Sequence, residues 1–237
     1  MKLRALLAPL LALAIPGAGV AVAPPAAVPA FKPTRFSVVV QGSGPDVILI
    51  PGLTGSRDVW KGTVAALPGY RYHLVQVAGF AGTAPAGNAK GPVVAPLAEE
   101  IARYIAARRL QRPAIVGHSM GGTAAMMVAA RHPALVGKVM VVDMLPQPAG
   151  LLGGTASGMR GLADALKGLS GTESGRQLIQ SAIRMFGTDE AQARGSDSDV
   201  VARATHELAV TDLSRELPRI RAPLTVVYAS ADETRAA

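Results

Sequence analysis

The sequence has 237 residues, of which 49% are hydrophobic and 17% are charged, and its mean hydropathy is +0.30. This balance is too apolar for a disordered polymer, and the length predicts one folded domain with a core of its own. The chain has no cysteine, which excludes a disulfide framework, a thiolate nucleophile and a cysteine-ligated metal. Any active site must therefore use hydroxyl, carboxylate or imidazole groups.

The formal net charge is +8, so an anionic partner has to be considered. The densest basic cluster is Arg108, Arg109 and Arg112, at the end of a predicted helix, where positive charge complements the helix dipole. A nucleic-acid surface would combine a basic stripe with aromatic side chains, and only 4% of the residues are aromatic. We therefore expect no nucleic-acid partner.

Residues 1–23 have the layout of a secretory signal peptide. Lys2 and Arg4 precede an apolar run, and small residues follow it up to an Ala21-Val22-Ala23 cleavage signature. Cleavage is expected after Ala21 or Ala23. An uncleaved anchor is the alternative, but the run is shorter than the ~20 apolar residues of a membrane span. We expect an exported protein, periplasmic or secreted, with no stable membrane span.

The remaining chain divides into a Pro/Ala-rich tether at residues 24–34 and a domain at residues 35–237. Short β-rich runs alternate with helical stretches along this domain. The pattern predicts strands at residues 36–40, 47–50, 72–77, 114–116, 138–142 and 224–228, and helices at residues 58–67, 94–110 and 120–131. Such alternation predicts an α/β fold, a mostly parallel sheet with helices on both faces.

Residues 145–217 interrupt the alternation with polar, helical sequence. Helices are expected there at residues 159–166, 175–186 and 199–210. One interpretation is an ordinary excursion packed on the sheet. Long insertions in compact α/β domains are more often functional, so we favour a helical lid that controls substrate access.

The chemistry of the chain centres on the segment Gly117-His118-Ser119-Met120-Gly121, a G-x-S-x-G pattern. A buried strand precedes it and a helix of small residues follows. A sharp strand-to-helix turn needs Gly117 and Gly121 because the neighbouring chain packs too closely for a side chain. The turn exposes the Ser119 hydroxyl at the carboxyl end of the sheet and at a helix N-terminus. Ser119 is therefore the candidate nucleophile, with a structural turn serine as the alternative.

With these residues the chain resembles the α/β-hydrolase superfamily. An earlier strand runs into Pro51-Gly52-Leu53-Thr54-Gly55, where the family has a His-Gly-x-x-Gly loop and this chain has Pro51 in place of the histidine. The resemblance implies that the backbone N–H groups of Leu53 and Met120 form an oxyanion hole. The glycine-rich segment at residues 78–82 also matches the family.

The resemblance further implies an acid after a late strand, and Asp232 stands at that position. Aspartate also favours loops after strands, so Asp232 could be a turn residue only. Asp143, after the strand that follows the elbow helix, is the reserve acid, because some members of the family place theirs there.

No histidine stands where the family order of Ser, acid, His requires it. The four histidines are His73, His118, His132 and His206, and all precede Asp232. The chain is either a C-terminally truncated hydrolase that lacks the last strand and helix, or a degenerate member. We favour truncation because the remaining motifs are intact. His118 is expected to be a packing residue of the elbow rather than a base.

These observations predict a serine hydrolase that acts on a small-molecule ester, with an amide as the second choice, and without a cofactor. Ser119 would attack the carbonyl, and Asp232 would orient a histidine as the base. The sequence His206-Glu207 begins like a zinc-binding H-E-x-x-H motif, but Val210 stands where the second histidine is needed, so we expect no metal. The alternative function is a catalytically inactive binding protein that keeps the pocket.

Overall fold

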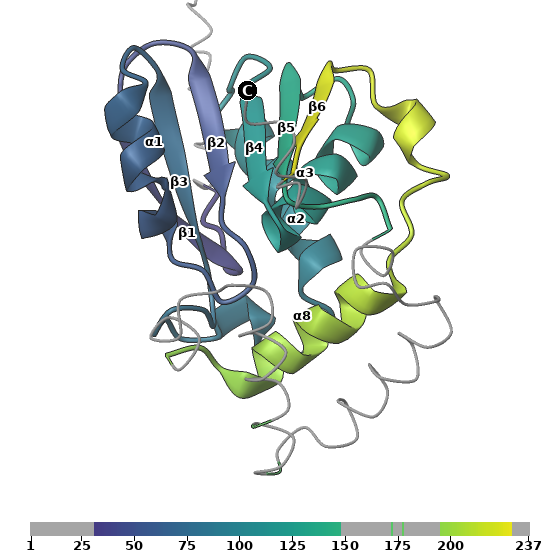
Figure 1. Cartoon of the computed structure of the whole chain (residues 1–237). Helices are drawn as coiled ribbons and strands as arrows, with labels where there is room; N and C mark the ends of the chain where they lie inside the picture. Colours follow the sequence, from purple (N-terminus) through teal and green to yellow (C-terminus); the bar gives the residue numbers. More distant parts are fainter. Residues whose placement is uncertain (1–30, 148–171, 173–176, 178–194, 229–237) are drawn as a thin grey trace, which may run out of the picture. The chain divides into compact units, whose positions relative to one another are not determined.

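A computed structural model describes residues 31–147, 172, 177 and 195–228. In this part of the chain six strands form one sheet with the order β1-β3-β2-β4-β5-β6 (Figure 1). The strands are β1 (Phe36–Gly42), β2 (Asp46–Ile50), β3 (Arg71–Val77), β4 (Ala114–His118), β5 (Lys138–Val142) and β6 (Leu224–Val227). Each lies where the hydrophobic pattern predicts a strand.

The helices also follow the predicted pattern. The α-helices are α1 (Lys61–Ala66), α2 (Val94–Ala107), α3 (Met120–Arg131) and α8 (Ser198–Val210), and the short 3-10 helices are η1 (Arg57–Trp60), η2 (Ala86–Asn88) and η3 (Leu217–Arg219). The helix expected at residues 199–210 is α8. The one expected at residues 159–166 lies outside the described residues, as does the one at 175–186 apart from Gln177.

Strands β2 to β6 pair in parallel, and β1 pairs antiparallel with β3. A short turn joins β1 to β2, so β1 runs opposite to β2. Because β3 is parallel to β2, β1 pairs antiparallel with β3. The parallel strands are linked by helical crossovers. The mostly parallel α/β sheet predicted from the sequence is confirmed. Parallel strands end at one edge of a sheet, so the loops after β2, β3, β4 and β5 meet at its carboxyl edge.

Side chains alternate between two apolar clusters on opposite faces of the sheet. On β2, Ile48 and Ile50 belong to the larger cluster, which includes α2 and α3, and Val47 and Leu49 belong to the smaller one. Trp60, 7% exposed, packs in the smaller cluster. Figure 1 shows α2 and α3 on one side of the sheet and α1 on the other.

Helix α8 crosses the carboxyl edge of the sheet (Figure 1). The glycine-rich segment at residues 78–82 holds its start: Asp197 donates its backbone N–H to Gly79 O at 2.7 Å, and Ala81 donates to Ser196 Oγ at 3.0 Å. Gly79 has φ +90°, and a Cβ there would stand 2.8 Å from Val200. Glycine thus lets α8 approach the loop after β3. None of the helices described is long and apolar enough to cross a membrane.

Candidate active site

Ser119 lies at the junction of β4 and α3, in the turn that the sequence predicts. Its φ of +50° and ψ of −118° place a non-glycine residue in a strained conformation. Three hydrogen bonds hold this conformation: Ser119 N–H donates to Val142 O at 2.8 Å, and Ser119 O accepts from Gly122 N–H at 2.8 Å and from Thr123 N–H at 3.2 Å. Strain of this kind persists only when the surroundings impose it, and it clusters at active sites.

The glycines of the turn have the steric role predicted for them. A Cβ on Gly117 would stand 2.1 Å from the carbonyl oxygen of Gly121, and a Cβ on Gly121 would stand 2.4 Å from that of Ile50. Both neighbours are backbone atoms, which cannot rotate away as a side chain could. The elbow therefore requires glycine at both positions.

The loop after β2 lies directly beside Ser119. A Cβ on Gly52 would stand 3.3 Å from Ser119 Cβ and 2.9 Å from His118 Nδ1. The loop then turns through a hydrogen bond from Gly55 N–H to Gly52 O at 3.1 Å, and Thr54 has a φ of +61°. Gly52 has no role of its own among the residues predicted from the sequence, although its position one residue before Leu53 is a signal for close backbone approach.

Leu53 lies in this loop, and Met120 lies in the elbow directly after Ser119. Leu53 is partly buried, and the Met120 side chain is completely buried at the first residue of α3. Among the described residues, neither amide has a backbone or side-chain acceptor. An unpaired amide at a helix N-terminus is a donor for developing negative charge.

His118 and Asp143 form a pair next to Ser119. His118 Nε2 lies 3.9 Å from Asp143 Oδ2, and both side chains are partly exposed. Asp143 follows β5 with a φ of +52°, and its N–H donates to Val227 O at 2.8 Å. Burial lowers the pKa of His118, and the Asp143 carboxylate opposes that shift. A lowered pKa leaves the imidazole neutral at pH 7, the form that can accept a proton.

Two of the other histidines, His73 and His132, contact side chains away from Ser119. His73 is buried on β3, with Nδ1 2.8 Å from the Tyr104 hydroxyl and Nε2 2.9 Å from Asp46 Oδ1. His132 ends α3, and its Nε2 lies 2.8 Å from Glu99 Oε2. His206 lies on α8, and Asp232 is outside the described residues. The structure therefore brings together Ser119, Leu53, Met120, His118 and Asp143.

Glu207, the second residue of the His206-Glu207 pair, has a structural role. Its carboxylate accepts backbone N–H groups of Val93, Val94 and Ala95 at the start of α2. In the part of the chain that the structure describes, no group of three or more His, Asp or Glu side chains could hold a metal ion. The contact of Glu207 with α2 could not be foreseen from the sequence, since 112 to 114 residues separate the partners.

Comparison with known proteins agrees with this geometry. A family model described as alpha/beta hydrolase fold matches residues 45–168. A pimeloyl-[acyl-carrier protein] methyl ester esterase of Aeromonas hydrophila is 34% identical over 106 residues, which are 44% of this chain and 40% of that protein. The chain thus matches about two fifths of the length of this curated relative.

Solved structures share the fold at low sequence identity. An esterase from Exiguobacterium antarcticum superposes with a TM-score of 0.64 at 22% identity, over 81% of this chain and 76% of the other. A hydrolase from Pseudomonas aeruginosa superposes with a TM-score of 0.62 at 17% identity, over 82% of this chain and 76% of that one. The matched sequence, the sheet order and the serine elbow lead to one conclusion: this chain belongs to the α/β hydrolase family.

Proposed function

We propose that this protein is a serine hydrolase that cleaves carboxylic esters of small molecules. The observation that carries the proposal is the strained Ser119 between β4 and α3, with the amides of Leu53 and Met120 left without acceptors among the described residues. The ester substrate is supported by the relatives, since two of those above are named esterases. An amide substrate is the second choice.

In the proposed reaction Ser119 Oγ attacks the ester carbonyl carbon. The hydroxyl proton passes to an imidazole base, a place in the family order that none of the four histidines of this sequence takes. The carbonyl oxygen becomes an oxyanion that accepts hydrogen bonds from Leu53 and Met120 N–H. The tetrahedral intermediate collapses, the alcohol leaves with the proton, and an acyl-enzyme remains on Ser119. Water then attacks the acyl group and releases the acid.

We assign the orientation of the imidazole base to Asp232, the acid that the family order places after a late strand, and keep Asp143 as the reserve acid. Asp143 has one observation in its support, its position 3.9 Å from the His118 ring beside the nucleophile. A test that separates the two acids is the turnover of the variants Asp232→Asn and Asp143→Asn, measured one at a time. Replacing the acid of the triad by asparagine should lower turnover by about 10⁴-fold, as loss of the correct tautomer does in other serine hydrolases.

The proposal is tested by reaction with a fluorophosphonate, which forms a covalent bond with an activated serine. Intact-mass measurement should show one adduct per chain, and peptide mapping should locate it on Ser119. The variant Ser119→Ala should give no adduct, whereas Ser43→Ala, a change at an exposed serine between β1 and β2, should label like the original chain. A folded chain that is not labelled would favour the inactive binding protein.

A further inference from the structure

Three turns lie side by side at the amino edge of the sheet, the edge opposite Ser119. They precede β4, β5 and β6. Gly137 N–H donates to Pro113 O at 3.0 Å, and Val139 N–H donates to Pro223 O at 2.9 Å. The register places Ala114 beside Lys138 and Val139 beside Leu224. Side chains of these turns therefore share one surface.

That surface is strongly basic. Six exposed basic residues, which we call the basic edge, lie in or next to these turns: Arg108, Arg109, Arg112, Lys138, Arg219 and Arg221. None of the six forms an ion pair with a carboxylate among the described residues. The chain has no Asp or Glu at residues 101–142 or 217–228. The charge of the basic edge is thus not balanced by acids within its own turns.

Two acids at this end of the sheet, Glu216 and Asp46, are already paired. Glu216 accepts two hydrogen bonds from the Arg131 guanidinium, at 2.8 and 2.9 Å. Asp46, at the same edge of the sheet, is bound by Arg71 and by His73. These pairs are neutral or nearly so, and they leave the six residues of the basic edge as excess positive charge.

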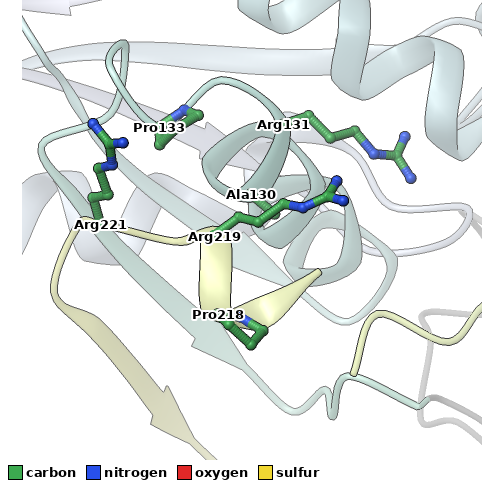
Figure 2. Close-up of a pocket in the computed structure, with 6 residues that line it drawn as sticks. All are labelled: Ala130, Arg131, Pro133, Pro218, Arg219 and Arg221. Carbon is green, nitrogen blue, oxygen red and sulfur yellow. The ribbon is translucent and has the colours of Figure 1, made fainter. Parts of the chain in front are cut away.

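A cavity of about 500 Å³ indents this surface between the end of α3 and η3. Ala130, Pro133 and Pro218 form its apolar wall, and Arg219 and Arg221 supply its unpaired charge. Arg131 also lines it, with its guanidinium bound to Glu216. Figure 2 shows Arg131 and Arg219 extending to the same side of the cavity and Arg221 on the opposite side, near Pro133. Guanidinium groups pair with phosphate oxygens through two hydrogen bonds, so a phosphate group fits this lining.

Interaction with the dipole of α2 explains only part of the basic edge. Arg108 caps α2 and Arg109 follows it, but Lys138, Arg219 and Arg221 belong to other elements. Arg109 and Arg112 also have φ values of +54° and +50°, where glycine would be less strained. The turn before β4 therefore keeps arginine at two positions where the backbone favours glycine.

The position and composition of the basic edge distinguish between partners. Single-stranded nucleic acid is bound through aromatic stacking platforms, and the described exposed residues of the three turns include no aromatic side chain. A carrier of the substrate would have to reach Ser119, which lies at the other end of β4 and α3. A broad anionic surface needs neither aromatic side chains nor access to Ser119. Binding to such a surface leaves the carboxyl edge open to solvent.

We propose that the basic edge docks this protein on a membrane surface of anionic phospholipids, with the cavity beside η3 receiving a lipid phosphate. Basic residues near such a surface are each attracted to it, and the attraction weakens with salt. Docking would orient the carboxyl edge, and with it Ser119, away from the bilayer. The protein would then act on substrates that arrive from solution.

The test is co-sedimentation of the full chain with vesicles of phosphatidylglycerol and phosphatidylcholine, compared with vesicles of phosphatidylcholine alone. Binding to the mixed vesicles should be stronger and should fall at high salt. In the triple variant Arg109→Gln, Arg219→Gln, Arg221→Gln the affinity should fall about a hundredfold, since each basic residue contributes about a fivefold factor. Thermal melting of the variant shows whether it has kept its fold.

A matched control removes three charges elsewhere: Lys32→Gln, Lys61→Gln, Lys90→Gln, all exposed and outside the three turns. It should change the affinity much less than the first triple variant. The second set Arg108→Gln, Arg112→Gln, Lys138→Gln repeats the test on the same surface if the first set unfolds. Equal binding to neutral and mixed vesicles, an equal loss in the control, or binding of polyglutamate without binding of mixed vesicles would refute the proposal. None of these measurements depends on hydrolysis.

Discussion

Replacing Glu207 by alanine should loosen helix α8 from the body of the domain. Its carboxylate accepts three backbone N–H groups at the start of α2, from Val93 at 2.7 Å, Val94 at 2.8 Å and Ala95 at 2.7 Å. No side chain of the adjacent sequence caps this helix. Glu207 therefore supplies the capping acceptor and the negative charge that the helix N-terminus favours.

The magnitude follows from those two contributions. Loss of a capping side chain costs about 1 kcal/mol, and loss of a well-placed charge at a partly buried helix terminus costs up to about 2 kcal/mol. Glu207→Ala should therefore lower the free energy of unfolding by about 1 to 3 kcal/mol. Glu207→Gln keeps an oxygen acceptor without the charge and should cost about half as much.

Urea unfolding measures the change in stability, and hydrogen exchange locates it. The amides of Val93, Val94 and Ala95 should exchange faster in Glu207→Ala than in the original chain. The amides of β2 should keep the same order of exchange rates among themselves in both proteins. Asp199→Ala, a change on the same helix at an exposed residue, is the control for a general effect on α8. A loss below about 0.5 kcal/mol with unchanged exchange at the start of α2 would refute the capping argument.

Four further predictions concern the site. In an active form of the protein, Ser119→Ala should lower ester turnover by about 10⁶-fold and leave substrate binding largely intact, as steady-state and binding measurements would show; turnover within tenfold of the original would remove Ser119 from the mechanism. Gly121→Ala should cost about 3 kcal/mol in urea unfolding, because its Cβ would stand 2.4 Å from the carbonyl oxygen of Ile50; a near-neutral change would mean that the elbow can shift. Burial lowers the pKa of His118, so its imidazole binds a proton more tightly in the unfolded chain than in the folded one. The free energy of unfolding should therefore fall as the pH drops below 6.5, and His118→Gln should make that fall less steep. Asp143→Asn removes the opposing charge, so an NMR titration should show the His118 pKa lower still; a rise would mean that the Asp143 carboxylate does not stabilise the imidazolium.

The sequence determined the elements and the elbow. Alternation of β-rich and helical runs predicted every strand of the described sheet, because the side-chain period of a buried strand is a local property. The G-x-S-x-G segment predicted Ser119 and the need for Gly117 and Gly121, since that turn is built within five consecutive residues. Leu53 could be named as well, but only through the resemblance to a family.

Only the tertiary structure decided which distant groups meet. The His118–Asp143 pair arises because β4 and β5 are parallel neighbours that end at the same edge. Glu207 reaches the start of α2 because α8 packs across that edge, and nothing in the local sequence of α2 requires a carboxylate from so far along the chain. The basic edge has the same origin: its arginines are scattered in sequence, and the parallel sheet gathers them, because all turns that precede its strands lie at one end.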